Sequence, residues 1–180
     1  MARRPAMAVV VSPVQAGRGA SAIATIRVRA DRAVLWRLLT SCADALQIVP
    51  GLRVCEVRKA AANRSWQQIR QVVDYSWYLP RVSYVVKASY RPPSRIAFHQ
   101  IAGDFSVLRG SWVLRRDGAA TVARYRFEVV PAFWIPGWIV RAQLRRDLPA
   151  MLRALRRRAE AADPPAARAA RRKMRRASVS

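Results

Sequence analysis

The feature that most constrains the fold is an amphipathic segment near the C-terminal end, from Gly137 to about Ala162. Its apolar residues recur at steps of three and four positions, which places them along one side of an α-helix: Leu144, Leu148, Met151, Leu152, Leu155 and Ala159. The other sides carry arginines, namely Arg141, Arg145, Arg146, Arg153, Arg156 and Arg157. An isolated helix cannot hide such a wide apolar stripe, so the sequence predicts that this helix packs on another layer.

The chain before this helix alternates apolar and polar residues in runs typical of β-strands. We expect a strand over 21–29, two short helices over 32–39 and 40–48, and then strands over 52–59, 64–75, 76–90, 95–101, 105–116 and 121–130. Asp31 is placed to cap the first helix, and Asp117-Gly118 predicts a tight hairpin. This order predicts an α+β fold in which the long helix packs over the concave face of a curved antiparallel sheet of about seven strands.

The two ends of the chain lack such patterns. Residues 1–20 contain Pro5, Pro13, Gly17 and Gly19, and we expect a flexible leader there. The short apolar run within 1–20 is too short for a membrane span or a secretion signal. Residues 163–180 are rich in alanine and arginine and predict a basic disordered tail. The sequence therefore predicts one folded domain over 21–162, as a monomer located in the cytoplasm or peripherally on the inner face of the membrane.

The formal net charge is +24, from 34 basic and 10 acidic residues. A surface of this charge attracts polyanions such as RNA, ribosomes or anionic lipid headgroups. The residues that we expect to make such contacts are Arg141, Arg145, Arg146, Arg171 and Arg172. Arginines greatly outnumber lysines, however, and alanine is abundant, so the composition of a GC-rich genome is an alternative explanation of the charge.

Reactive side chains are few and scattered. Cys42 and Cys55 have no CxxC spacing, and we expect them to be small buried residues rather than a disulfide or a zinc site. His99 falls on the outward face of its strand. The acidic residues occur singly, without the spacing of a metal cluster, a carboxylate pair or a catalytic triad. The sequence thus predicts no catalytic residue, no metal and no cofactor.

Four stretches resemble a known family: Arg91-Pro92-Pro93-Ser94-Arg95-Ile96-Ala97-Phe98, Gly103-Asp104-Phe105, Gly110-Ser111-Trp112 and the run from Arg145 to Leu152. Together with the element order, they resemble the START-like (SRPBCC) superfamily and its helix-grip fold. The resemblance is to the polyketide cyclase/dehydrase and lipid-transport branch, which includes coenzyme Q-binding proteins and ribosome-associated toxin-like proteins. It covers about Ala22 to Ala162 and implies an apolar ligand cavity between the sheet and the long helix.

Strand alternation selects the residues that would line such a cavity: Gln68, Val82, Tyr84, Val86, Phe98, Leu108, Trp112, Tyr125, Phe127, Leu144, Leu148 and Leu152. Small residues among them, at Gly110, Ala123 and Ala88, would leave room, although a fully packed core would have the same composition. The hydroxyls of Tyr84 and Tyr125 and the Gln68 amide suit a carbonyl- or quinone-bearing ligand, or they satisfy one another.

The segment from Pro131 to Trp138 places aromatic residues between prolines, just before the arginines of the long helix. It suits either a lip that touches lipid headgroups or a loop packed against the first helices. Our first hypothesis is the binding and transport of a hydrophobic small molecule, a lipid or an isoprenoid quinone. The alternatives are a ribosome- or RNA-associated protein and an aromatase/cyclase that acts on a polyketide.

Overall fold

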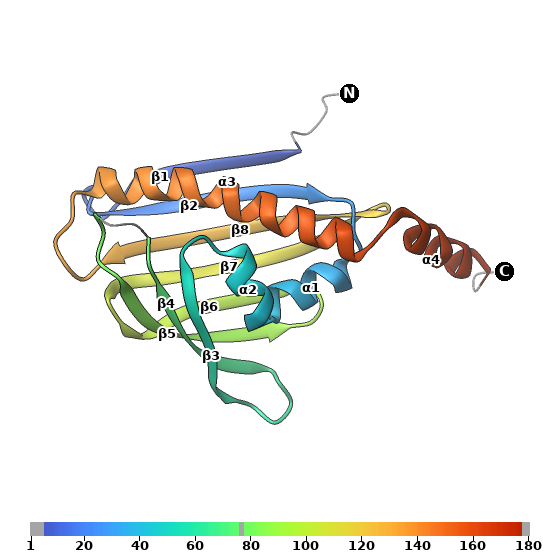
Figure 1. Cartoon of the computed structure of the whole chain (residues 1–180), viewed down its shortest axis with the longest axis horizontal. Coiled ribbons are helices and arrows are strands. Elements are labelled where there is room, and N and C mark those ends of the chain that lie inside the picture. The colour runs from blue at the N-terminus through green and yellow to red at the C-terminus, as the bar shows by residue number, and fades with distance from the viewer. Residues whose placement is uncertain (1–5, 76–77, 178–180) are drawn as a thin grey trace.

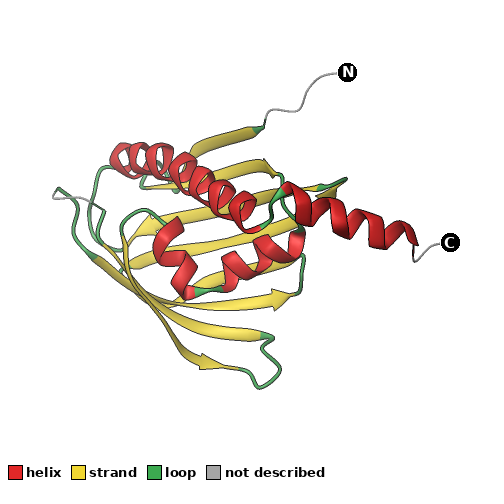
Figure 2. Ribbon diagram, turned by 45° about the vertical axis from the view of Figure 1, so that its right-hand side comes forward, coloured by secondary structure: helices red, strands yellow, loops and turns green. Residues whose placement is uncertain are grey.

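The computed structural model describes residues 6–75 and 78–177, and within them eight strands form one antiparallel sheet in the order β1-β2-β8-β7-β6-β5-β4-β3. Helices α1, α2 and α3 lie on one face of the sheet, and α4 projects beyond its end (Figures 1 and 2). The elements are β1 Met7–Val14, β2 Gly19–Val28, α1 Arg32–Thr40, α2 Cys42–Ile48, β3 Leu52–Ala60, β4 Trp66–Val73, β5 Val82–Arg91, β6 Arg95–Gly103, β7 Phe105–Asp117, β8 Ala120–Pro131, α3 Gly137–Ala162 and α4 Pro165–Ala177. The predicted α+β fold is confirmed, with one more strand than expected.

Local sequence signals set most of these boundaries. The Asp31 carboxylate accepts a hydrogen bond from the Ala33 backbone N–H at 2.9 Å and caps α1 as expected. The Ser41 hydroxyl accepts one from the Asp44 N–H at 3.2 Å and caps α2. The β7–β8 hairpin turns at Gly118, whose φ of +62° lies in the left-handed region that glycine adopts without strain.

The N-terminal segment differs from the expected flexible leader, because residues 7–14 form strand β1 along β2. Met7, Val9 and Val11 are half-buried and pack against the core, whereas Ala8, Val10 and Ser12 are exposed. This alternation is typical of an edge strand with one face on the core. The turn after it, with positive φ at Gln15, Ala16 and Gly17, returns the chain to β2.

The C-terminal segment also differs from the expected disordered tail, because Pro165–Ala177 forms helix α4. Two of its arginines bind the chain just before it. Arg171 forms an ion pair with the carboxylate of Asp163, and Arg168 donates to the Asp163 carbonyl oxygen. Asp163 is buried, and its carboxylate also accepts from the Asp31 backbone N–H at 2.7 Å. Contacts with the folded body, rather than an apolar stripe, therefore hold the first turns of α4.

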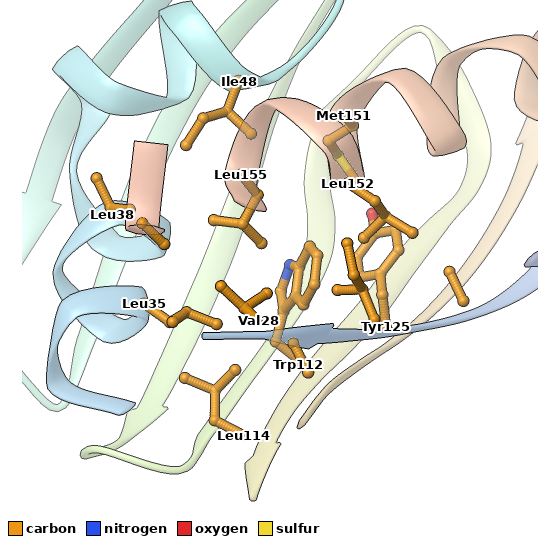
Figure 3. Packing of buried hydrophobic residues seen from close by; sticks show 14 of the residues in the cluster. Val28, Leu35, Leu38, Ile48, Trp112, Leu114, Tyr125, Met151, Leu152 and Leu155 are labelled. Carbon is orange, nitrogen blue, oxygen red and sulfur yellow. The ribbon is translucent and has the colours of Figure 1, made fainter. Parts of the chain in front are cut away.

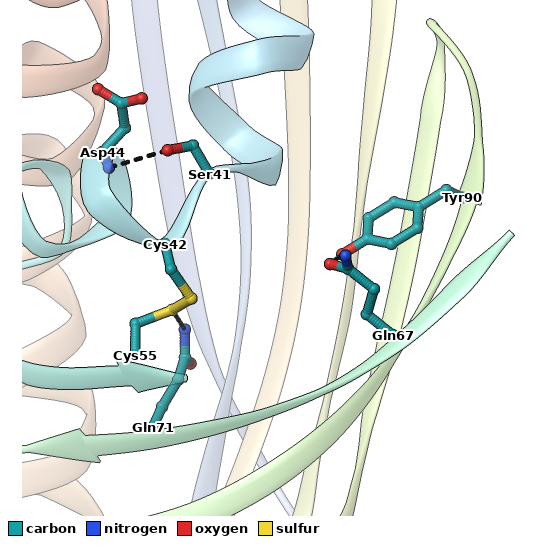
Figure 4. Close-up of a disulfide and its surroundings, with 7 residues drawn as sticks. All are labelled: Ser41, Cys42, Asp44, Cys55, Gln67, Gln71 and Tyr90. Atoms are coloured by element: carbon teal, nitrogen blue, oxygen red, sulfur yellow. Dashed lines mark hydrogen bonds between the residues drawn. A yellow bond between two sulfur atoms is a disulfide. The ribbon is translucent and has the colours of Figure 1, made fainter. Parts of the chain in front are cut away.

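The two cysteines form a disulfide, so the expectation of two separate buried thiols is wrong. Cys42 begins α2 and Cys55 lies in β3, with their Cα atoms 5.3 Å apart (Figure 4). Because α2 packs across β3, residues 13 positions apart in the chain come within bonding reach. This proximity depends on the tertiary fold, which a search for cysteine spacing motifs does not detect.

The buried residues form two clusters under α3. The first cluster lies around the C-terminal half of α3, where Leu152 and Leu155 lie close to Trp112 and Tyr125, with Leu35 of α1 beside them (Figure 3). The second cluster comprises Leu52, Val73, Val82, Tyr84, Val86, Phe105, Leu108 and Val129, with Val140 and Leu144 packed against it from the N-terminal half of α3. The long helix thus covers two different parts of the sheet.

Candidate functional site

An apolar pocket lies between the sheet and the N-terminal half of α3. It contains about 480 Å³ of space that no atom fills, part of it open to solvent. It is narrow, since the centre of a water molecule can occupy only about 50 Å³ of it. The walls come from β5, β7, β8, α3 and the connections before β5 and α3, namely Tyr75, Leu79, Pro80, Val82, Phe105, Phe127, Val129, Pro131, Phe133, Ile135, Val140, Gln143 and Leu144.

Three of the predicted cavity residues, Val82, Phe127 and Leu144, line this pocket. Tyr84, Val86 and Leu108 lie in the second cluster, to which the pocket residue Val82 also belongs. The other inward residues belong to or pack against the first cluster: Phe98, Trp112, Tyr125, Leu148 and Leu152. The structure therefore places these predicted residues on the inner side of the sheet or in α3, but it spreads them over a packed region and an open one.

Aromatic rings occupy the interior where the sequence predicted room beside small residues. The ring centroids of Trp112 and Tyr125 are 4.3 Å apart, and Phe98 stacks on Tyr125 at 6.3 Å. A Cβ on Gly110 would lie 2.5 Å from Cζ of Phe98. The space beside Gly110 is thus filled by the Phe98 ring, so this small residue allows close packing rather than a void.

Gln68 lies on the outer face of the sheet, so its placement in the cavity is wrong. The β4–β5 register sets Gln68 opposite Lys87, and it sets Gln71 opposite Tyr84. Because side chains alternate along a strand, an error of one position exchanges the two faces. The inner face carries Gln67, whose amide oxygen accepts from the Tyr90 hydroxyl at 3.0 Å (Figure 4).

Sequence reasoning missed most of the pocket residues that lie outside strands, including Leu79, Pro80, Phe133 and Ile135. Alternation applies to strands only, so it gave no direction for these side chains. A signal was present in α3, where Val140 precedes Leu144 by four positions and extends the apolar stripe by one turn.

Three tyrosine hydroxyls lie in this region without a hydrogen-bond partner among the described residues: those of Tyr75, Tyr84 and Tyr125. The tyrosine hydroxyls with a partner in the described part of the chain are those of Tyr78 and Tyr90. Burial raises the pKa of Tyr75, Tyr84 and Tyr125 well above the usual value. The proximity of Tyr75 adds to the pKa increase of the other two. The three hydroxyls are therefore neutral donors, grouped around Tyr75.

A chain of hydrogen bonds runs along α3 at the edge of the pocket. The Tyr78 hydroxyl bonds to Oε1 of Gln143 at 3.2 Å, and Nε2 of Gln143 donates to the Asp147 carboxylate at 2.8 Å. Burial raises the pKa of Asp147, although the bond from Gln143 and the nearby Arg146 act in the opposite direction. The negative charge of Asp147 in turn contributes to the raised pKa of Tyr75. No lysine, arginine or histidine is among the side chains that line the described pocket.

The predicted anionic-surface arginines lie at two ends of the molecule. At the start of α3, Arg141 donates to the Gly17 carbonyl oxygen at 3.1 Å, while Arg145 and Arg146 are exposed. In α4, Arg171 is paired with Asp163, and the side chain of Arg172 lies outside the described residues. His99 is exposed on the outer face, as expected. Within the described chain, no helix is both long enough and apolar enough to span a bilayer.

Several solved structures share this fold. A STAR-related lipid transfer protein from Xanthomonas axonopodis superposes with a TM-score of 0.73 at 16% identity, over 87% of this chain and 94% of that protein. A START superfamily protein from Mycobacterium smegmatis gives 0.68 at 17% identity, over 78% and 97% of the two chains. The Zhui aromatase/cyclase from Streptomyces sp. R1128 gives 0.65 at 18% identity, over 86% and 94%.

These structural similarities show the fold alone, because all three identities are low. No curated protein sequence matches the chain. The family model for polyketide cyclase/dehydrase and lipid transport matches residues 28–156, which cover α1, α2, strands β3 to β8 and most of α3. The chain therefore belongs to the polyketide cyclase/dehydrase and lipid transport family.

Proposed function

We propose that this protein binds and transports a hydrophobic small molecule, a lipid or an isoprenoid quinone, in the pocket beneath the N-terminal half of α3. The observation that carries the proposal is an apolar pocket next to a group of tyrosine hydroxyls that have no partner in the described structure. Apolar walls contribute about 25 cal/mol for each Å² of ligand surface that they remove from water. The ligand's hydrocarbon part would therefore supply most of the affinity.

The polar groups of the site favour a ligand whose polar part is an uncharged oxygen acceptor. Tyr75, Tyr84 and Tyr125 offer neutral donors, and the lining side chains include no cation that would offset the cost of burying a carboxylate or phosphate. The half-buried Asp147 would disfavour a second negative charge nearby. A ketone, ester or quinone oxygen fits these conditions. The aromatic stack of Phe98, Tyr125 and Phe127 extends from this region into the core.

The test is to extract freshly purified protein with organic solvent and identify any bound compound by mass spectrometry, beside native mass spectra of the intact protein. We expect co-purified apolar compounds and saturable binding of a fluorescent acyl or quinone probe. Val140→Trp, which fills the pocket from α3, should abolish probe binding, whereas Ala142→Phe on an exposed position of the same helix should not. Equal binding by the Val140 variant would contradict the proposal. Enzymatic conversion of a bound polyketide would support the aromatase/cyclase alternative instead.

A second candidate function, association with RNA or ribosomes, is favoured by α4. This helix carries Arg168, Arg171 and Lys173 and lies at the opposite end of the molecule from the start of α3 (Figure 1). Affinity for a nucleic acid should fall steeply as salt rises, because each neutralised phosphate releases counterions. Ribosome co-sedimentation that is lost on deletion of residues 164–180 would support this function. Unchanged co-sedimentation of that truncated protein would exclude α4 as the contact.

A further inference from the structure

The loop that closes one side of the pocket has a second face in solvent. Phe133 and Ile135 line the pocket, whereas Trp134 between them is 86% exposed. Trp138, one turn further on in α3, is 64% exposed. Large aromatic side chains with this exposure lose the free energy that burial would give them, and two of them together form an apolar projection beside the pocket.

Arginines from two elements border these tryptophans. Trp138, Arg141 and Arg145 follow one another at helical spacing along one side of α3. Arg18 comes from the β1–β2 turn, which Arg141 contacts through the Gly17 carbonyl oxygen. Neither residues 15–18 nor residues 131–146 include an acidic side chain. The local charge is therefore positive and is not offset by neighbours in these two segments.

An open hollow lies between the β1–β2 turn and the loop before α3, with about 680 Å³ of space that no atom fills, part of it open to solvent. Its walls include Gly17 and Arg18 of the β1–β2 turn and Trp134, Pro136 and Gly137 of the loop before α3. The contact between the elements is close, because a Cβ on Gly137 would lie 1.5 Å from the Gly17 carbonyl oxygen. The turn and the loop thus form one continuous surface at this end of the protein.

We propose that this surface, formed by Trp134, Trp138, Arg18, Arg141 and Arg145, docks on an anionic phospholipid bilayer. Indole rings favour the boundary between lipid headgroups and acyl chains, and arginines beside them meet lipid phosphates. Because Phe133 and Ile135 belong to the same loop, docking would place the pocket next to the hydrocarbon layer. In this respect the inference rests on the proposed function and specifies where the ligand enters and leaves.

A bilayer fits this surface better than RNA does. The projecting side chains are two indoles flanked by proline and isoleucine, and the basic residues form a border around them. The more uniformly basic element, α4, lies at the far end of the molecule (Figure 1). Polyanion binding through charge alone should therefore depend on α4, whereas membrane docking should depend on the tryptophans.

The experiment is flotation of the full-length protein with vesicles of phosphatidylcholine alone or mixed with phosphatidylserine, without added ligand. We expect binding to the mixed vesicles, with quenching of tryptophan fluorescence by brominated acyl chains. Trp134→Ser with Trp138→Ser should remove both the binding and the quenching. Arg18→Gln with Arg145→Gln should weaken binding roughly 25-fold, at about a factor of five for each arginine. The matched control, Arg124→Gln with Arg126→Gln on the exposed outer face of the sheet, removes the same charge and should change binding far less.

Any of three results would contradict the docking surface. The first is a tryptophan variant that floats as well as the unaltered protein does, and the second is a control pair that weakens binding as much as the Arg18 and Arg145 pair. The third contradicting result is a protein that binds RNA through these arginines and does not bind vesicles. Circular dichroism of each variant checks that it folds. Probe binding in solution, measured without vesicles, tests the pocket separately. If the tryptophan variant no longer floats but still binds the probe, the docking surface is separate from the pocket. If the unaltered protein floats with vesicles but binds no probe, the docking surface stands and the carrier function is rejected.

Discussion

The ring of Phe98 lies against Gly110 so closely that a Cβ there would be 2.5 Å from Cζ of the ring and 2.6 Å from the Arg126 carbonyl oxygen. Gly110→Ala should therefore destabilise the protein, because the backbone carbonyl of β8 cannot move away cheaply. We expect the free energy of unfolding to fall by about 1–3 kcal/mol, the usual cost of overpacking a core. Urea denaturation followed by circular dichroism measures this change.

A double variant, Gly110→Ala with Phe98→Leu, separates the two contacts. If the ring is the main obstacle, the smaller side chain at position 98 restores part of the lost stability. If the carbonyl of Arg126 dominates, the double variant is less stable than either single one. A Gly110→Ala protein as stable as the unaltered chain would contradict the close packing of Phe98 on β7.

Tyr84→Phe should leave the stability of the ligand-free protein unchanged or slightly higher, because the Tyr84 hydroxyl has no partner among the described residues. The same variant should lose roughly tenfold in affinity for a probe with a ketone or quinone oxygen, the worth of one buried hydrogen bond. Thermal denaturation and probe titration measure the two effects.

Tyr90→Phe is the matched control for this prediction. The Tyr90 hydroxyl donates to Gln67, and burial raises its pKa to about 12. Removing this hydroxyl leaves the amide oxygen of Gln67 without its partner, so stability should fall by about 1 kcal/mol while probe affinity stays the same. Equal stability losses in the two variants would show that the Tyr84 hydroxyl is satisfied in the protein.

Replacing both Cys42 and Cys55 by serine should lower the free energy of unfolding by about 3 kcal/mol. The disulfide closes a short loop. Its loss gives the unfolded chain more conformational entropy, which lowers the free energy of unfolding by about that amount. Disulfides persist mainly in oxidising compartments, so the bond is an argument against the predicted cytoplasmic location. Alkylation before and after reduction, read by mass spectrometry, should detect no free thiols in unreduced protein. A quantitative yield of two alkylated thiols would contradict the bond.

Asp147→Asn should stabilise the protein at neutral pH by up to ~1 kcal/mol. Burial raises the pKa of Asp147 in the folded state above the unfolded value of about 3.9. The folded protein therefore binds more protons between these two pKa values, and its stability falls as pH rises through that range. Asparagine keeps an oxygen that accepts from Gln143 and lacks the cost of the buried charge. The difference in melting temperature should shrink toward zero below about pH 4. A constant difference at all pH values would point to packing instead.

The sequence was sufficient for the parts of the fold that depend on local periodicity. The side chains of Val82, Tyr84 and Val86 face inward as alternation predicts, and Asp31 caps α1. Gln68 shows the weakness of the same argument. A strand in which both faces are polar or half-buried, such as Trp66–Val73, gives little contrast between its faces, so its orientation was set by pairing with β5.

The pocket itself was harder to foresee, because it arises where elements distant in sequence fail to fill space. Leu79 and Phe133 are brought together by the sheet, and neither lies in a periodic segment. The ring of Phe98 occupies the space beside Gly110, so the presence of a small residue alone did not indicate where a void would remain. Strand β1 was missed for a related reason: the prolines and glycines of residues 1–20 suggested a leader, whereas backbone pairing with β2 decides the conformation of residues 7–14.

The contact between Gly17 and Gly137 joins the first hairpin to the first turn of α3 with no side chain between them. The amino-terminal hairpin is therefore a support for the end of the protein that holds the pocket and not merely an added edge of the sheet. Shortening the protein before β2, or fusing a partner into this turn, would release the helix start and the Trp134 loop together. Expression strategies that trim the first twenty residues should then remove both proposed binding activities at once.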